Sequence, residues 1–388
     1  MAIDIQTSHA PSVVAVEPVL SAAQRRRFVE LPWAIYRDDP HWIPPLRGNL
    51  VRMLDYTHSP FYADAEIRTF LATRGGRDVG RIAAIVNHAH NRRYAERRGF
   101  FGFFECEDDV ATATALFTAA ETWLASQGMT AMRGPTNPSM NHECGLLVDG
   151  FHESPTFMNT YNPSWYGSLF DRCGFRRAHD LYAFSGSLDA LAAVVDRLAP
   201  ITEACQRRHG VVLRPFRMAS FRSEVRTFLD IFNRSFEKLW GFVPMAEAEI
   251  ADMAGDLRLL LVPELTAIAE MKGTAVGAVF ALPDYNPRIK AIDGRLFPFG
   301  FLRLLWNKRA IRRVRVISAN VVPEYQTFGL GLLLLTSLLP AARRRGVEEV
   351  EFSWVHESNH LSYGVLDRIG MQITKTYRLY DRDIQRTA

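Results

Sequence analysis

Two short segments, one in each half of the chain, are nearly the same. YGSLFDRCGF occupies positions 166–175, and YGVLDRIGM occupies positions 363–371. Both place Asp-Arg-x-Gly at the end of an expected helix and directly before an expected strand, and glycine ends a helix well because it accepts a positive φ. The equivalent place of the two copies indicates an internal duplication. Since 388 residues are also long for one domain, we expect two α+β halves.

The hydrophobic pattern divides the chain into four parts. These are a disordered tail at 1–20, the first half at 21–186, a helical connector at 187–210 and the second half at 211–388. Each half is expected to hold a mixed, mainly antiparallel sheet flanked by helices. Pro200 is expected to kink or divide the connector, and Pro340 to break or bend a later helix. The main expected strands are 66–74, 79–87, 99–107, 211–218, 314–322 and 347–355, and the main expected helices are 108–128, 332–346 and 359–370.

Composition excludes several classes of protein. The formal net charge of +4 is too small to indicate nucleic-acid binding. The four cysteines form no Cys-x-x-Cys pair, so we expect neither a metal site nor a disulfide framework, and the chain suits a reducing compartment. The first twenty residues contain no Lys or Arg, unlike a signal peptide, and no stretch of roughly 18 uncharged apolar residues occurs. We therefore expect a cytoplasmic chain without a membrane span.

A strand, a glycine-bearing turn and a helix follow one another at VVPEYQTFGLG, positions 321–331. Backbone N–H groups point out of such a turn, and the helix dipole adds partial positive charge. Glycine lets a phosphate approach the backbone closely. The stretch is not a Walker loop, since no Lys-Ser/Thr follows, and not a dinucleotide fingerprint, since only Gly-x-Gly is present. We interpret it as a pyrophosphate cradle, with a plain strand–turn–helix as the alternative.

The pattern Gln326-x-x-Gly329-x-Gly331 resembles the Q/R-x-x-G-x-G/A loop of the GNAT superfamily of acyl-CoA-dependent N-acyltransferases. The order of strands and helices over 211–380 is similar as well. The resemblance implies a thioester co-substrate, either acyl-CoA or an acyl carrier protein, whose pantetheine arm pairs with the strand before the loop. The residues assigned to this carrier are Val321, Val322, Gln326, Phe328, Gly329, Leu330, Gly331, Leu332 and Asn359. Asn359 also suits a helix cap.

The first half resembles the same fold without the glycine loop. At the equivalent point stand Cys106, Glu107, Asp108 and Asp109, whose carboxylates would repel a pyrophosphate. We interpret the first half as a degenerate domain that shapes the acceptor site and binds no carrier.

Acyl transfer to an amine needs a base for the amine and an N–H donor for the oxyanion. Glu357 and His356 are candidates for the base, and Glu324 is a third, close to the phosphates. The splayed strand before the glycine loop is expected to supply the N–H donor. In many members of the family a tyrosine on the last helix protonates the thiolate. Leu366 stands at that position here, and Tyr363, one turn earlier, is the candidate replacement.

The first half contains two polar segments that suit a substrate site. NPSMNHECG spans positions 137–145, and TYNPSWY spans positions 160–166. Polar loops on a rigid scaffold often bind ligands, although local turn chemistry by Asn and Ser explains such segments equally well. The residues assigned to the acceptor are Asn137, Asn141, Glu143, Tyr161, Asn162 and Asn320.

The stretch LFPFGFLRLLWNKRAIRRVRV, positions 296–316, combines apolar and basic residues. As a helix, residues 301–314 would carry one apolar and one basic face with Trp306 near the boundary, which is typical of a helix lying in a membrane surface. We therefore expect an anionic membrane surface as a partner through 296–316. An acidic acyl carrier protein suits the basic clusters as well.

The whole chain resembles a bacterial tandem-GNAT group that includes the bacterial ceramide synthases. The matching segments include RGPTNPSMNHECGLLVDGF (133–151) and FSWVHESN (352–359). This resemblance implies a long-chain N-acyltransferase that acts on a lipid-like amine such as a sphingoid base. Two alternatives stay open. One is a soluble N-acetyltransferase of a small amine, in which 296–316 is core, and the other is a non-catalytic acyl-CoA-binding protein, which Leu366 suggests.

Overall fold

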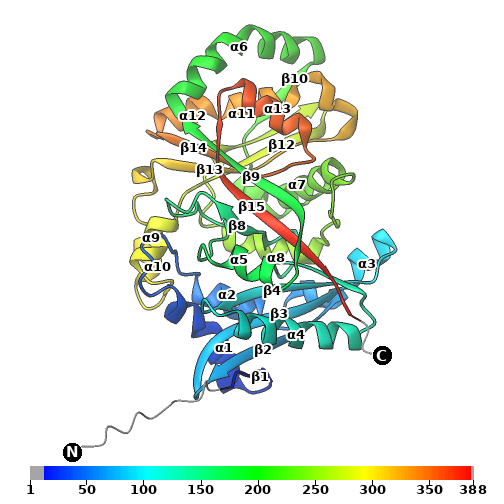
Figure 1. The fold of residues 1–388 in the computed structure, drawn as a ribbon. Helices are drawn as coiled ribbons and strands as arrows, with labels where there is room; N and C mark the ends of the chain where they lie inside the picture. The colour runs from blue at the N-terminus through cyan, green and yellow to red at the C-terminus, as the bar shows by residue number, and fades with distance from the viewer. Residues whose placement is uncertain (1–12, 386–388) are drawn as a thin grey trace, which may run out of the picture.

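A computed structural model describes residues 13–385, and one twisted sheet of 13 strands runs through the molecule from end to end (Figure 1). Neighbouring strands follow the order β1-β2-β3-β4-β5-β15-β9-β14-β13-β12-β11-β10, and β8 also pairs with β15. Neighbours are antiparallel except in the pairs β4–β5 and β13–β14. The mixed α+β fold is therefore confirmed. The strands are β1 (Ala15–Pro18), β2 (Ala65–Arg74), β3 (Arg77–Asn87), β4 (Arg98–Cys106), β5 (Ala131–Gly134), β8 (Leu146–Asp149), β9 (Arg176–Ser187), β10 (Val211–Arg214), β11 (Thr266–Met271), β12 (Thr274–Pro283), β13 (Arg313–Val321), β14 (Glu349–His356) and β15 (Gln372–Asp383).

The two halves exchange their last strands, which cross the middle of the molecule as the long green and red arrows of Figure 1. β9 ends the first half but pairs with β14 of the second, whereas β15 ends the chain but pairs with β5 of the first half. β9 and β15 also pair with each other in antiparallel fashion. Each follows one copy of the repeated segment, behind Gly174 and Gly370, which both have a φ of 79°. Neither half therefore completes its sheet without the other.

Helices cover both faces of the sheet in the first half. α4 (Val110–Ser126) and α5 (Tyr166–Arg172) pack on one face. α1 (Ala22–Ile35) and α2 (Arg47–Met53) pack on the other. Two polar strands, β6 (Thr136–Asn137) and β7 (Glu143–Cys144), form a separate small ladder.

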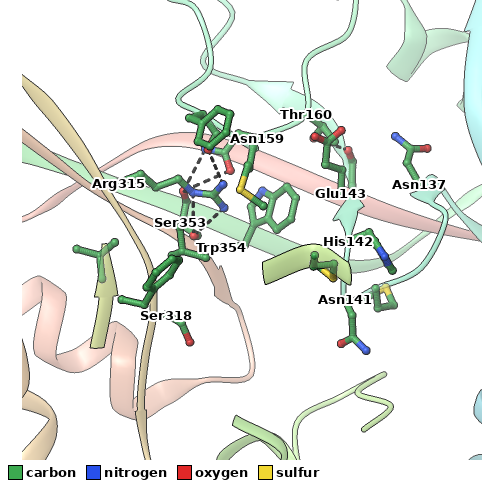
Figure 2. A pocket seen from close by; sticks show the side chains of 18 of the residues that line it. Asn137, Asn141, His142, Glu143, Asn159, Thr160, Arg315, Ser318, Ser353 and Trp354 are labelled. Carbon is green, nitrogen blue, oxygen red and sulfur yellow. Dashed lines mark hydrogen bonds between the residues drawn. The ribbon is translucent and has the colours of Figure 1, made fainter. Parts of the chain in front are cut away.

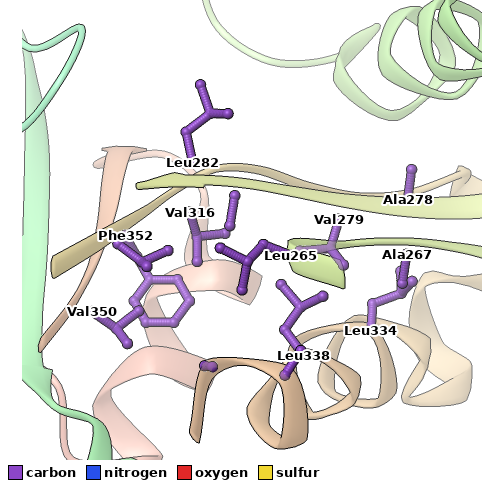
Figure 3. Close-up of a cluster of buried hydrophobic side chains, with 14 of the residues drawn as sticks. Leu265, Ala267, Ala278, Val279, Leu282, Val316, Leu334, Leu338, Val350 and Phe352 are labelled. Atoms are coloured by element: carbon purple, nitrogen blue, oxygen red, sulfur yellow. The ribbon is translucent and has the colours of Figure 1, made fainter. Parts of the chain in front are cut away.

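The second half has its core between the sheet and α11 (Leu330–Ser337). Figure 3 shows Val279 and Val316 directed at Leu334 of this helix, whereas Ala278 points to the opposite face. Phe280, the neighbour of Val279, contacts Phe228 with ring centroids 6.0 Å apart. Since strand side chains alternate, α7 (Phe221–Phe236), which carries Phe228, lies across the sheet from α11. The connector between the halves is α6 (Leu188–His209). The other helices of the second half are α8 (Glu247–Leu257), α9 (Asn286–Ala291), α10 (Gly300–Leu305), α12 (Leu339–Arg344) and α13 (His360–Arg368).

Several local predictions are confirmed by the caps. The Asp109 side chain accepts a hydrogen bond from the Thr112 N–H (2.8 Å) at the start of α4. The Asn359 side chain accepts one from the Ser362 N–H (3.2 Å) at the start of α13. The connector is a single helix, α6, that contains a proline and is not divided. Pro340 lies in the first turn of α12, so the helix expected over 332–346 is broken into α11 and α12.

Two predictions need correction. Residues 15–18, which the sequence placed in a disordered tail, form β1 and pair with β2; residues 1–12 of that tail lie outside the described residues. The single amphipathic helix over 301–314 is also wrong. α10 ends at Leu305, Asn307 has a φ of 41°, and β13 begins at Arg313. The segment from Arg313 onward is a strand because Val314 and Val316 are buried in the central sheet.

Between residues 13 and 385, no helix is long and apolar enough to cross a membrane.

Candidate active site

The central strands of the second half separate at one point. β13 and β14 are paired as far as Val316 and Phe352. β13 then continues along β12, where the Val322 N–H donates to the Val276 carbonyl (3.0 Å). Because backbone groups alternate in direction along a strand, the Val321 N–H faces away from β12 and into the opening beside β14. The opening therefore offers a backbone donor to a ligand.

The glycine loop follows this opening directly. A 3-10 turn, η5 (Pro323–Phe328), leads to Gly329, whose φ of 79° is left-handed, and α11 starts at the next residue. The first N–H of α11 to bond back belongs to Leu333, which donates to the Gly329 carbonyl (3.1 Å), so the earlier N–H groups point out of the helix start. A Cβ added at Gly331 would meet nothing within 4 Å. The Gln326 side chain donates to the Val321 carbonyl (3.1 Å) and holds the loop to the strand. This arrangement fits a pyrophosphate.

The other predicted carrier residues differ in what they offer. Leu332 lines the cavity described below. Leu330 and Val322 are fully buried. The Val322 N–H and carbonyl are already bonded to Val276 and Tyr325, so of these two residues only the Leu330 N–H is available to a ligand. The Phe328 ring stacks on His209 with centroids 4.6 Å apart and is thereby turned toward α6. Asn359 lines the cavity and caps α13 at the same time.

A large cavity of about 1010 Å³ adjoins the glycine loop and is lined by both halves (Figure 2). The first half supplies α2 and the two polar segments 135–146 and 155–162. The second half supplies α7, α8, β13, β14 and the start of α13. Ligand pockets usually measure roughly 300–1,000 Å³, so this cavity is at the upper end. The donor loop and most of the acceptor-side wall therefore come from different halves.

One part of the cavity is apolar and aromatic. Its side chains come from three helices, namely Phe221, Phe228, Phe232 and Phe236 of α7, Met253 and Leu257 of α8, and Leu50 and Met53 of α2. At this end Arg52 of α2 forms an ion pair with Asp256 of α8, which joins the two halves. Such a lining suits a long hydrocarbon chain better than a small polar amine.

Glu143 holds the one carboxylate of the described cavity wall that has no ion-pair partner. Glu105 pairs with Arg81, and Asp252 and Asp256 pair with a single arginine of α2. Burial raises the pKa of the Glu143 carboxyl to about 7, and the positive charge of Arg315 opposes that rise. A carboxyl with this pKa is partly ionised at neutral pH and can accept a proton from an amine.

Five polar atoms of the cavity-lining residues are buried without a hydrogen-bond partner. Two are Arg81 Nε and Ser235 Oγ, and the other three, on β13 and β14, are Asn320 Oδ1, Trp354 Nε1 and His356 Nδ1. A buried polar atom without a partner lowers stability by roughly 1–3 kcal/mol. The most direct explanation is that a bound ligand supplies the missing partners. Together with Glu143, the three atoms on β13 and β14 define the polar part of the cavity.

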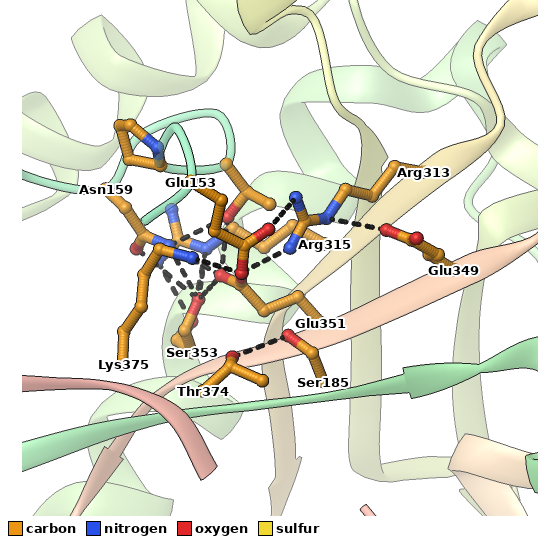
Figure 4. A network of polar contacts seen from close by, with 12 residues as sticks. Glu153, Asn159, Ser185, Arg313, Arg315, Glu349, Glu351, Ser353, Thr374 and Lys375 are labelled. Atoms are coloured by element: carbon orange, nitrogen blue, oxygen red, sulfur yellow. Dashed lines mark hydrogen bonds and ion pairs between the residues drawn. The ribbon is translucent and has the colours of Figure 1, made fainter. Parts of the chain in front are cut away.

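A buried ionic network holds this polar part in place (Figure 4). The Arg315 guanidinium donates to the carbonyls of Phe157 (2.7 Å) and Ser353 (2.9 Å). Glu351, which is fully buried, accepts from Asn159 (2.6 Å) and from the Ser353 hydroxyl (2.7 Å). Since Phe157 and Asn159 belong to the first half, the network joins the segment 155–162 to β13 and β14.

The three predicted catalytic residues are placed differently. Glu357 does not line the cavity: it forms an ion pair with Arg177 and lies 3.2 Å from His179 Nδ1. Tyr363 also lies outside the cavity, and its ring centroid is 5.3 Å from that of Phe184 on β9. His356 does line the cavity, but burial and the neighbouring His179 lower its pKa to about 3. His356 is therefore a neutral hydrogen-bonding group, and a weak base.

Several of the residues predicted to bind the acyl acceptor form hydrogen bonds within the protein instead. Asn137 accepts from the Phe103 N–H (2.6 Å), and Asn141 donates to the Val243 carbonyl (2.8 Å). Tyr161 donates to Asp39 (2.9 Å). Asn162 binds the backbone of Leu147 on both sides (2.7 and 3.1 Å). All four line the cavity, whereas Asn320 Oδ1 and the Glu143 carboxylate, in the same wall, accept no hydrogen bond from the protein. Glu324 pairs with Arg234 (3.1 Å) at the surface.

The equivalent positions of the first half are occupied by the chain itself. A Cβ at Gly102 would stand 1.6 Å from the Thr136 carbonyl oxygen, so the segment around Thr136 lies directly against β4. Beyond β4, Asp109 caps α4 and pairs with Arg74. The helix start is thus occupied by the chain's own carboxylate, as the sequence predicts.

Sequence reasoning missed Arg315 and Trp354. The signal for Arg315 was present, because a charged residue stands between Val314 and Val316 near the start of a strand. Between residues 13 and 385, no group of three or more His, Cys, Asp or Glu residues is placed to hold a metal ion.

Comparison with known proteins gives consistent results. Residues 225–371 match the family model described as Acetyltransferase (GNAT) family. The chain is 35% identical over 382 residues to the protein named bacterial ceramide synthase of Caulobacter vibrioides, covering 95% of this chain and 97% of that protein. It is 33% identical over 377 residues to Protein YghO of Escherichia coli, covering 95% of each. The solved tandem GNAT protein from the clavulanic acid biosynthesis pathway has a similar fold, with a TM-score of 0.57 at 13% identity, over 97% of this chain and 100% of that one.

Proposed function

Because this chain belongs to the GNAT acetyltransferase family and is an N-acyltransferase, we propose that it transfers a long acyl chain to the amine of a lipid-like acceptor such as a sphingoid base. The observation that carries the proposal is the cavity of about 1010 Å³, in which aromatic and aliphatic walls lead to Glu143 and to the glycine loop. The name of the relative from Caulobacter vibrioides supports the same choice of acceptor.

The donor is a phosphopantetheine thioester, carried by CoA or by an acyl carrier protein. The N–H groups at the start of α11 hold the pyrophosphate when CoA is the carrier, and Gln326 keeps that loop in register with β13. The Val321 N–H in the strand opening is directed at the thioester carbonyl and stabilises its oxyanion.

Glu143 is the general base in this scheme. The amine nitrogen attacks the thioester carbon as its proton moves to the Glu143 carboxylate, an amide C–N bond forms and the C–S bond breaks. The thiolate leaves and takes a proton from solvent, and Glu143 releases its proton to solvent, so the products are an amide and a free thiol and the base is regenerated. The pKa of about 7 suits this role because the base is ionised in part at neutral pH and still holds a proton after transfer.

The experiment is to incubate the protein with detergent-dispersed sphinganine and a series of donors from acetyl-CoA to stearoyl-CoA, with palmitoyl acyl carrier protein in a parallel arm. Products are identified by mass spectrometry. We expect a long-chain amide from at least one carrier, and the two arms tell CoA from carrier protein. Transfer of acetyl groups alone, or no amide with either carrier, would remove the proposal.

A further inference from the structure

An aromatic surface stands out on the segment between β12 and β13. The side chains of Phe297, Phe299 and Trp306 are 82%, 73% and 78% exposed, and Phe301 and Leu302 are 38% and 54% exposed. We call these five residues the aromatic patch. Within the described residues, every Phe or Trp that is exposed to this degree belongs to it. Exposed aromatic groups gathered in one place mark an interaction site.

The surroundings of the aromatic patch are basic. The sequence contains no Asp or Glu from 294 to 323. In the described part of the chain, Arg303, Lys308 and Arg309 form no ion pair, and Lys308 instead donates to the carbonyl of Leu259, which is itself 65% exposed. An apolar patch rimmed by unpaired cations has the chemistry of a surface that binds anionic lipid headgroups.

The aromatic patch is held firmly, unlike a loose loop. Leu304 of α10 is buried beneath it. The Arg288 guanidinium donates to the carbonyls of Leu304 (3.0 Å) and Asn307 (2.8 Å) and so fixes both ends of the turn. Asp293, just before the patch, accepts from the Trp33 indole (2.6 Å) on α1. The segment, shown in yellow in Figure 1, is therefore docked on the first half close to the helices that wall the cavity.

We propose that the aromatic patch inserts into the headgroup region of an anionic bilayer, with the neighbouring cations bound to lipid phosphates. A second copy of the chain is a poorer occupant, because a symmetric dimer through this patch would bring unpaired cations against unpaired cations. The proposal does not depend on which acyl donor or amine the enzyme uses.

The test is flotation of the full chain with vesicles of phosphatidylethanolamine and phosphatidylglycerol, compared with vesicles of phosphatidylcholine. We expect binding to the anionic vesicles and at least tenfold less to the neutral ones. Two triple variants test the apolar and the basic parts separately. The first combines Phe297→Ser, Phe299→Ser and Trp306→Ser, and the second combines Arg303→Glu, Lys308→Glu and Arg309→Glu. Each is expected to lower binding to the anionic vesicles at least tenfold.

A matched control changes exposed apolar residues at the other end of the molecule. Ile201 and Val212 are 61% and 59% exposed on α6 and β10, and Ile201→Ser with Val212→Ser should float like the wild type. All variants should keep the melting temperature and the turnover of detergent-dispersed substrate. Absence of flotation by the wild type, equal binding to both vesicles, or a wild-type dimer that the patch variant converts to monomer would each overturn the proposal.

Discussion

The carboxyl group of Glu143 and the guanidinium group of Arg315 influence each other through charge, with no hydrogen bond between them. Glu143 comes from the first half of the chain and Arg315 from the second, and both line the same cavity. Burial raises the pKa of Glu143 to about 7 and Arg315 limits the rise. Arg315 donates its hydrogen bonds to the Phe157 carbonyl and to the carbonyl and hydroxyl of Ser353, which leaves the Glu143 carboxylate free to act on a ligand.

Replacing Glu143 with Gln should remove the base and keep the shape of the cavity. We expect kcat/KM to fall roughly 100-fold or more. In the wild type, kcat/KM should rise as the pH passes about 7, because the base works when deprotonated. Glu143→Gln should lack that inflection, which a pH profile of both proteins measures. A variant that keeps the inflection would show that another group is the base.

The same carboxyl should make stability depend on pH. Its pKa rises from 4.5 to about 7 on folding, so the folded state binds the proton more tightly than the unfolded chain. The stability that protonated Glu143 contributes is therefore complete below about pH 4.5 and is lost as the pH rises toward 7. Relative to Glu143→Gln, the wild type should lose about 2–3 kcal/mol between pH 5 and pH 8. Urea unfolding of both proteins at the two pH values measures this difference. An equal change in the free energy of unfolding for both proteins would count against the raised pKa of Glu143.

Two residues that the sequence put forward for catalysis should be dispensable. Glu357→Gln and Tyr363→Phe alter side chains outside the cavity. We expect kcat/KM within about threefold of the wild type for both, since neither side chain lines the cavity. Steady-state kinetics decide the matter: a loss as large as that of Glu143→Gln in either variant would mean that the catalytic centre lies elsewhere.

Gly331→Glu should block the donor and spare the fold. A Cβ at this position meets nothing within 4 Å, and an acidic side chain at a helix start is favourable for stability. We expect KM for the acyl donor to rise at least about tenfold, with the melting temperature unchanged, because a carboxylate would repel the pyrophosphate. Gly167→Glu is the matched control, since Gly167 is also the second residue of a helix with nothing within 4 Å, and lies outside the cavity. If both variants raise KM alike, the glycine loop is not the carrier site.

The strand exchange predicts that the halves depend on each other. Residues 1–210 lack β15, which pairs with β5, and residues 211–388 lack β9, which pairs with β14. Each half made alone is therefore expected to aggregate or to unfold without cooperativity, whereas co-expressed halves should purify together. Circular dichroism on heating reports the result. A second half that melts cooperatively by itself, near the temperature of the full chain, would contradict this topology.

Local features of the fold could be predicted because local physics decides them. The caps at Asp109 and Asn359 and the positive φ of Gly174 and Gly370 depend on a few neighbouring residues. The exchange of β9 and β15 could not be predicted from the sequence, because the two strands follow the same repeat and either pairing buries similar side chains. The prediction of a helix over 301–314 was wrong because burial of Val314 and Val316 in the sheet outweighs the helical pattern of the sequence.

The candidate site could be predicted in part. Residue order put forward the glycine loop as a candidate carrier site, and a polar loop put forward Glu143 as a candidate residue for binding the acceptor, not as the base. The raised pKa of the Glu143 carboxyl depends on burial by segments that lie far apart in the chain. No local sequence pattern reveals such burial. Tyr363 looked suitable by its spacing, but its ring packs on Phe184 of a strand that comes from the other half.

The most direct measurement is the ratio of kcat/KM for palmitoyl-CoA to that for acetyl-CoA, with the same long-chain amine as acceptor. We expect a ratio of roughly 100 or more, since each buried methylene contributes about 0.8 kcal/mol and only part of that is realised in the transition state. A ratio near or below one would contradict the central claim that the cavity between the two halves is built for a long acyl chain.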